Sequence, residues 1–96
     1  SSSDRRLKSH IKDASPSECL SMIRNITPKT YTRVDMSDSI RIGFLANEIQ
    51  DFAPLEFGNL IGRRPDGLLN MDYSRLTAVL WSVVQQQEAR LTALGG

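Results

Sequence analysis

Two side chains near the start of the sequence, Ser3 and Lys8, are of the types that form a serine–lysine catalytic pair. A lysine amine that loses its solvent has a pKa well below the ordinary value of about 10.4, and it can then take the proton of a serine hydroxyl. The spacing of five residues matches neither a helix face nor a strand face, so Ser3 and Lys8 would meet only across a turn. Terminal serines are common and lysines are usually solvated, so an incidental pair is the open alternative.

His10 offers a second base, although a single histidine in a polar segment is usually just exposed. The chain contains one histidine and one cysteine, Cys19, which are too few for a typical structural zinc site. A single cysteine also excludes a disulfide framework within the chain and fits a reducing compartment. Glycine-rich phosphate-binding loops are absent. We therefore expect no metal and no cofactor.

The length and charge of the chain limit which other classes of function are possible. Ninety-six residues make one domain with a modest core, and oligomerisation is a common remedy at this size. Twelve Lys and Arg residues balance eleven Asp and Glu residues, so no strong field favours nucleic acid or an acidic membrane. No apolar run approaches the roughly 20 residues of a membrane span, and no signal-peptide core is present. The composition predicts a soluble module with neither nucleic acid nor membrane as a partner.

The last third of the chain predicts one long helix over residues 72–94. Large apolar residues recur there in steps of three and four, and no proline or glycine interrupts them. Asp72 is the expected N-cap, and Gly95 the expected residue after the helix. At about 1.5 Å per residue the helix would be roughly 33 Å long, more than so small a domain needs. We expect its first turns to pack in the chain's own core, with Trp81 against the hairpin, and its later turns to pair with copies of themselves. The alternative is a helix that lies along a monomer.

A short helix is predicted to start at Ser15. Ser15 suits the N-cap, Pro16 the first helical position and Glu18 the third, where its side chain can reach back to the cap. Apolar residues follow at helical spacing as far as residue 26, and Pro28 ends the run.

The residues between the two helices predict a hairpin, a second short helix and a loop. Residues 29–34 and 40–46 favour two strands joined by a polar turn, and Gly43 marks a bulge or a close approach of the backbone. Residues 47–53 suggest a short helix that turns Phe52 inward. The chain loosens from residue 58 to residue 67, where residues 62–67 suggest a turn or mobile loop, and residues 68–71 suggest a brief extended segment that leads into the long helix. The fold class is therefore α+β: short helices and a β-hairpin, followed by the long C-terminal helix.

Three motifs occur in one order along the chain: SDRRLK at residues 3–8, GFLANE at residues 43–48 and MDYSRL at residues 71–76. Together they resemble the C-terminal intramolecular chaperone domain of bacteriophage tailspikes, tail fibres and neck appendages. That family is one of self-cleaving serine peptidases, and myelin regulatory factor carries a relative of it. The resemblance extends from residue 3 to about residue 94.

The resemblance implies a homotrimer that helps the upstream stalk of its own precursor to fold and then cuts itself off before Ser3. The cleaved bond would join Ser2 to Ser3, with Ser3 as nucleophile and Lys8 as base. Asp4, Arg5 and Arg6 would orient the cleaved segment or stabilise the oxyanion. The site of action would be the cytoplasm of a host bacterium during virion assembly, with the domain released from the mature fibre.

The resemblance also implies a layout for the chain. Residues 1–96 form a single autoprocessing chaperone domain, with a cleavage-site segment at 1–14 and the helix, hairpin and loop region at 15–71. The hairpin region would reach towards the stalk as an arm. Residues 72–94 would form a three-stranded coiled coil. The residues expected at its seam are Leu76, Leu80, Val83, Val84, Gln87, Leu91 and Leu94.

Gln87 is the polar member of this seam. A buried polar residue at a seam lowers stability but can specify register and strand number. Alternatively, Gln87 faces solvent beside the seam.

Two other classes of function remain. The chain could be a trimerisation or interaction module without catalysis, or a monomeric α+β domain that binds a partner through the long helix.

Overall fold

The computed structural model describes residues 3–35, 39–58 and 60–95. It confirms the α+β class and the long C-terminal helix. The described elements are, in chain order, η1 (Arg5–Leu7), α1 (Pro16–Asn25), β1 (Lys29–Tyr31), β2 (Arg41–Gly43), α2 (Ala46–Phe52), η2 (Leu55–Phe57), β3 (Ile61–Arg63), β4 (Leu69–Met71) and α3 (Tyr73–Ala93).

Both long helices begin where their capping residues predict. The Ser15 side chain accepts a hydrogen bond from the Glu18 backbone N–H, and Pro16 is the first residue of α1. Asp72 likewise accepts from the Arg75 backbone N–H at 3.2 Å and starts α3. At the other end of α3, Gly95 has a φ of 84°, a left-handed conformation that glycine adopts without a steric penalty. Local capping chemistry therefore sets the bounds of α3 within a residue of the prediction.

The predicted hairpin is present, with shorter strands. β1 and β2 pair antiparallel, Lys29 opposite Gly43 and Tyr31 opposite Arg41. A side chain at Gly43 would meet the hydroxyl groups of Tyr31 and Tyr73 at 3.1 and 3.3 Å, so the predicted close approach is confirmed. The polar turn predicted at residues 35–39 lies partly outside the described residues.

A second hairpin occupies residues 61–71. The extended segment predicted at residues 68–71 is confirmed as β4, whereas the strand β3 was not predicted, so the turn or loop expected at residues 62–67 is shorter than predicted. β3 pairs antiparallel with β4, placing Gly62 opposite Asn70. The turn itself is confined to residues 64–68, where the Arg64 N–H donates to the Leu68 carbonyl and the Asp66 side chain accepts from the Leu68 N–H. The Pro-Asp-Gly signal predicted this turn correctly, but a tight turn also brings its two flanks into pairing distance, and that pairing was not predicted.

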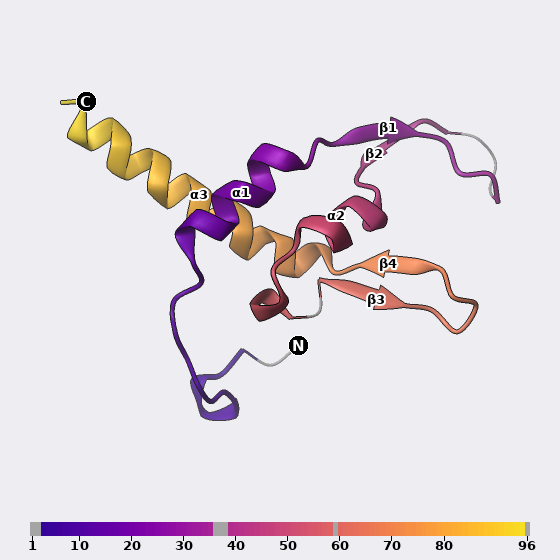
Figure 1. The fold of residues 1–96 in the computed structure, drawn as a ribbon, viewed down its shortest axis with the longest axis horizontal. Coiled ribbons are helices and arrows are strands. Elements are labelled where there is room, and N and C mark those ends of the chain that lie inside the picture. Colours follow the sequence, from indigo (N-terminus) through magenta and orange to yellow (C-terminus); the bar gives the residue numbers. More distant parts are fainter. Residues whose placement is uncertain (1–2, 36–38, 59, 96) are drawn as a thin grey trace.

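One small core lies where α1, α2 and α3 meet. α1 crosses α3, and both hairpins project in the direction opposite to the carboxyl end of α3 (Figure 1). The buried hydrophobic residues of the described part are Cys19, Met22, Ile26, Ile49, Leu60, Leu76, Val79 and Val83.

The single chain is more open than its length requires. Its radius of gyration is 16.2 Å, whereas a compact domain of this size has about 12–13 Å. The segment before α1 runs away from the helices, and η1 stands apart from the core (Figure 1). Large hydrophobic side chains remain exposed along this segment, on both hairpins and on α3. These surfaces are available for partners.

Two aromatic residues do not lie where the sequence suggested. Trp81 does not pack against the hairpin, because its side chain is 71% exposed. At 100° per residue it points away from the face of α3 that carries Val79 and Val83 into the core. Phe52, at the last position of α2, is 47% exposed rather than inward.

Candidate functional site

Ser3 and Lys8 lie on either side of the single turn η1. The Asp4 side chain caps this turn by accepting the Arg6 backbone N–H at 2.8 Å, and the Lys8 N–H donates to the Arg5 carbonyl at 3.0 Å. The turn that a five-residue spacing requires is therefore present. Both side chains are exposed, and within the described residues neither makes a hydrogen bond or ion pair. Ser2, on the other side of the expected cleavage, lies outside the described residues.

Asp4 and Arg6 bind each other. The guanidinium group of Arg6 donates to both carboxylate oxygens of Asp4, at 3.1 and 2.9 Å. These hydrogen bonds hold the pKa of Asp4 below its ordinary value and raise that of Arg6. The pair is exposed, so its main effect is to brace the turn rather than to stabilise the fold. Of the three residues expected to orient the cleavage segment or stabilise its oxyanion, Asp4 and Arg6 are engaged in this bracing, and Arg5 is exposed on the same turn.

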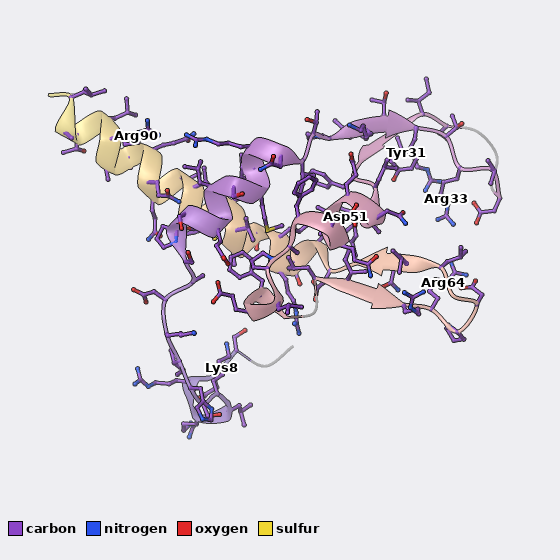
Figure 2. The ribbon with its side chains drawn as sticks, viewed as in Figure 1. Lys8, Tyr31, Arg33, Asp51, Arg64 and Arg90 are labelled. Carbon is purple, nitrogen blue, oxygen red and sulfur yellow. The ribbon has the colours of Figure 1, made fainter. Side chains whose placement is uncertain are left out.

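His10, the alternative base, marks a bend in the segment. It has a φ of 54°, in the left-handed region that non-glycine residues rarely adopt. Its Nδ1 atom lies 3.2 Å from the hydroxyl of Ser9. The bend turns the chain between η1 and α1, so Lys8 and α1 lie on different sides of it. Figure 2 shows Lys8 on this segment, away from the helices.

A cavity of about 710 Å³ separates the segment from the body of the domain. The segment provides one wall, residues 8–15. The core provides the other, with buried Cys19, Leu60 and Val79. Lys8 therefore lines the same cavity as three buried residues of the core.

A pair of carboxylates lies beside this cavity, and sequence reasoning missed it. Glu18, near the start of α1, and Glu56, in η2, come so close that Glu56 raises the pKa of Glu18 above its ordinary value, first through a shared hydrogen bond and then through partial burial and charge repulsion. The Oε2 atom of Glu18 is buried without a hydrogen-bond partner among the described residues. No sequence signal links two residues on separate elements, so only the packing of η2 on α1 reveals the pair.

The expected seam of α3 divides into two sets. Leu76 and Val83 are buried in the core of the single chain, at 9% and 5% exposure. The other five face solvent, and with two further residues they form one row spaced four, three, four, three along the helix. The exposed row is Tyr73, Thr77, Leu80, Val84, Gln87, Leu91 and Leu94.

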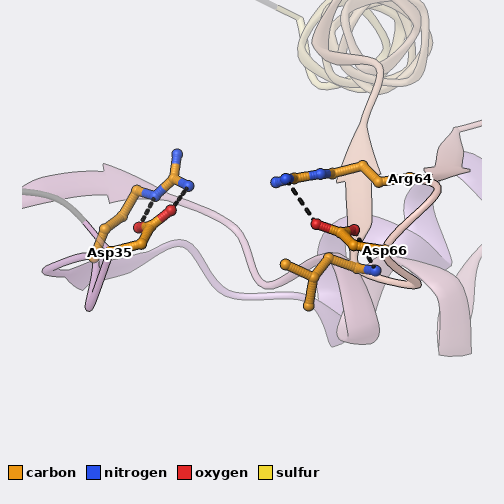
Figure 3. Close-up of polar contacts among 5 residues, drawn as sticks. Asp35, Arg64 and Asp66 are labelled. Atoms are coloured by element: carbon orange, nitrogen blue, oxygen red, sulfur yellow. Dashed lines mark hydrogen bonds and ion pairs between the residues drawn. The ribbon is translucent and has the colours of Figure 1, made fainter.

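Two oppositely charged pairs occupy the tips of the hairpins. Arg33 contacts Asp35 at 2.6 Å, and Arg64 contacts Asp66 at 2.8 Å (Figure 3). The pKa of Asp35 lies below its ordinary value because Arg33 donates to it, with a smaller contribution from Arg64 of the other hairpin. The two tips therefore lie close enough to interact. The Arg-x-Asp spacing occurs in both turns, and it is the signal that sequence reasoning overlooked.

No group of histidine, cysteine and acidic residues suited to a metal ion occurs in the described part of the chain. Within residues 3–35, 39–58 and 60–95, no helix combines the length and apolar character needed to cross a membrane.

Fold and site together define a class: a small α+β domain with a long C-terminal helix, two projecting hairpins and an exposed Ser–Lys segment. The Peptidase_S74 family, described as the chaperone of endosialidase, matches residues 3–56, more than half of the chain, and the protein belongs to this family. No curated protein matches the sequence. The family supports a role as an intramolecular chaperone and implies a serine-peptidase activity directed at its own chain. The match includes Ser3 and Lys8 but ends before α3.

Proposed function

We propose that this domain is a homotrimeric intramolecular chaperone that ends a phage tailspike or fibre protein and then releases itself by one cut before Ser3. The observation that carries the proposal is the exposed row on α3. Seven residues at alternating steps of three and four form the pattern of a coiled-coil seam. Membership of the chaperone family supports the same conclusion from a different part of the chain.

In the proposed trimer, the exposed row of each α3 helix packs against the same row of the other copies. Leu80, Val84 and Leu91 are 51–61% exposed and lie roughly a quarter turn around α3 from the buried Val79 and Val83. The hydrogen bond from Gln86 to the Pro16 carbonyl, at 2.9 Å, holds the other face of α3 against α1. Leu76 and Val83 thus belong to the core of the single subunit. The proposed coiled-coil seam therefore consists of the exposed row without these two residues. Gln87 lies within it, where a polar residue can specify register.

Trimerisation would assist folding by raising the local concentration of the three stalks. Bringing three long chains into register is opposed by entropy, and pairing of distant β segments is slow. A domain that joins the three carboxyl ends raises the local concentration of the stalks. The two hairpins, with their paired charged tips, form the arm that reaches back towards the stalk. Assembly would take place in the cytoplasm of the host bacterium.

The cut would follow the chemistry of a serine–lysine pair. Ser3 Oγ attacks the carbonyl carbon of Ser2 while the Lys8 amine takes the hydroxyl proton. The bond from that carbon to the Ser3 nitrogen breaks, the nitrogen receives the proton from Lys8, and an ester joins Ser2 to Ser3 Oγ. Water then hydrolyses the ester, leaving a carboxylate on Ser2 and a released chain that begins at Ser3. Hydrolysis regenerates the Ser3 hydroxyl, but the domain turns over once because the bond that Ser3 attacks lies in its own chain and is now broken.

The test uses the precursor with its upstream stalk. We expect Ser3→Ala and Lys8→Ala to abolish release while trimer formation continues, as measured by mass spectrometry and light scattering. Arg24→Ala, which removes an exposed cation on α1 away from the segment, is the control and should still be cut. Release of a domain beginning at Ser3 from either variant would show that the pair is not catalytic.

The second candidate is a trimerisation module without catalysis. The exposure of Ser3 and Lys8 favours it, because a lysine works as a base only after its amine loses solvent. A mature fibre that keeps the domain attached, in a trimer that dissociates when α3 is altered, would select this candidate.

A further inference from the structure

The segment between η1 and α1 is unsupported in a way that calls for a partner. We name residues 7–14 the strap. All its residues are exposed, including Leu7 at 71% and Ile11 at 60%. From residue 9 to residue 14, the strap makes no backbone hydrogen bond to another described residue. Two aliphatic side chains on a segment this polar have nothing to cover them.

The cavity beneath the strap has the opposite composition. Its floor is formed by the apolar side chains of Cys19, Phe57, Leu60 and Val79. At about 710 Å³ it has room for an isoleucine side chain with space to spare. Ile11 itself belongs to the wall of this cavity, so it needs only a rotation of the strap to enter. The bend at His10, the residue before Ile11, provides a place for that rotation.

Charge favours the same movement. The strap carries Lys8 and Lys12, and both line the cavity together with Glu56. Glu18 and Glu56 form a carboxylate pair, and the Oε2 atom of Glu18 is buried without a partner among the described residues. A lysine ammonium brought to this pair would supply the missing hydrogen bond and oppose the repulsion between the carboxylates.

We infer that the strap closes onto the body of its own subunit, with Ile11 seated in the cavity floored by Cys19, Leu60 and Val79 and Lys12 paired with Glu18 and Glu56. The occupant is part of the same chain, so its effective concentration is high without any second molecule. Closure draws Lys8 against the domain and takes water from its amine. Ile11 is thus a positioning residue for Lys8. This last consequence rests on the proposed function, whereas the docking of the strap does not.

The direct test is a methyl NOESY spectrum of the released trimer with its native sequence. Closure predicts cross-peaks from the Ile11 methyl groups to those of Leu60 and Val79. A spectrum in which Ile11 shows none of these cross-peaks overturns the inference.

A crosslinking test uses the single native cysteine. Ile11→Cys places a second thiol on the strap, and Leu7→Cys is the control at another exposed aliphatic position outside the cavity wall. For a freely moving strap, the loop to Cys19 favours position 11 over position 7 by only about twofold. Closure predicts a preference of about tenfold or more, since a seated side chain has a far higher effective concentration. Rates within twofold of each other overturn closure.

The functional arm separates this inference from the proposed function. In the precursor, Ile11→Ser should slow release by about tenfold or more, and Ile11→Leu should keep the native rate because it still fills the cavity. If Ile11→Ser is cut normally and the cross-peaks are absent, the strap inference fails and the serine–lysine chemistry stands. If the cross-peaks are present but Lys8→Ala is still cut, closure stands and the proposed chemistry fails.

Discussion

At the scale of single residues, several charged groups of this chain pair with residues close to them in the sequence. Asp4 binds Arg6, Asp35 binds Arg33 and Asp66 binds Arg64. These pairs are two residues apart and exposed, so they shape turns more than they stabilise the fold. The carboxylate pair of Glu18 and Glu56 differs, because it joins two elements and brings like charges together.

This pair makes a prediction about pH. The folded-state pKa of Glu18 is raised, first by its hydrogen bond with Glu56, so the folded state holds that proton more tightly than the unfolded chain. The stability it contributes is fully present below the ordinary glutamate pKa and is lost as the pH rises through the folded-state value. In a Lys12→Ala background, where no strap ammonium can pair with these carboxylates, we expect Glu18→Gln to raise the melting temperature at neutral pH and to leave it unchanged in acid.

Thermal unfolding between acid and neutral pH measures this effect. Glu56→Gln should act in the same way, and the double variant should gain little more, because either change alone removes the repulsion. Asp51→Asn, an exposed carboxyl on α2, is the control and should show neither effect. A Glu18→Gln variant that is less stable at neutral pH than its Lys12→Ala parent would contradict the prediction.

At the scale of elements, substitutions of Leu76 and Leu80 on α3 test folding of the subunit and its proposed assembly separately. Leu76 is 9% exposed and Leu80 is 51% exposed, yet they lie one turn apart on the same helix. Leu76→Ala should lower the free energy of unfolding of each subunit by about 2–5 kcal/mol, because it leaves a cavity in the core. Leu80→Ala should leave the subunit folded and weaken its association instead.

Denaturant unfolding and sedimentation velocity distinguish the two effects. Both variants replace leucine by alanine, so a difference between them reflects the position of the residue and not its type. If Leu80→Ala unfolds the subunit as severely as Leu76→Ala while association is unchanged, the exposed row is not a seam.

Elements whose ends are set by local chemistry could be predicted from the sequence. Ser15 and Asp72 cap their helices through hydrogen bonds to residues three positions away, so a short window contains the signal. The β3–β4 hairpin was missed because its short strands alternate weakly, and their pairing depends on a turn that reads equally well as a loop. The assignment of the Ser–Lys segment came from a motif, and the structure adds the intervening turn.

The two faces of α3 were harder to separate. Leu76 and Val83 belong to the core and Leu80 and Val84 to the exposed row, but all four fall on one broad apolar stripe in the sequence. Only the position of α1 decides which side is covered. Trp81 was misplaced for the same reason.

At the scale of the whole molecule, the chain has a small core and many large hydrophobic side chains that remain exposed. A radius of gyration of 16.2 Å and an exposed helical row support the proposal that copies of the chain complete its structure. In the proposed trimer, folding of the subunit and assembly would be separate steps. Cleavage after assembly would make release depend on both.

Trp81 should report this assembly, because it is the only tryptophan in the chain. It follows Leu80 of the exposed row, and together with Thr77, Val84 and Glu88 it lines a hollow along one face of α3. A neighbouring helix that covers the row would also cover this hollow and remove water from the indole ring. We expect the emission maximum of the trimer to lie at shorter wavelength than that of the diluted subunit, with a transition at the concentration where sedimentation shows dissociation. Val84→Asp, which places a charge in the row, should give subunit-like emission at every concentration. An emission maximum that stays the same through the dissociation would show that the copies meet through another surface.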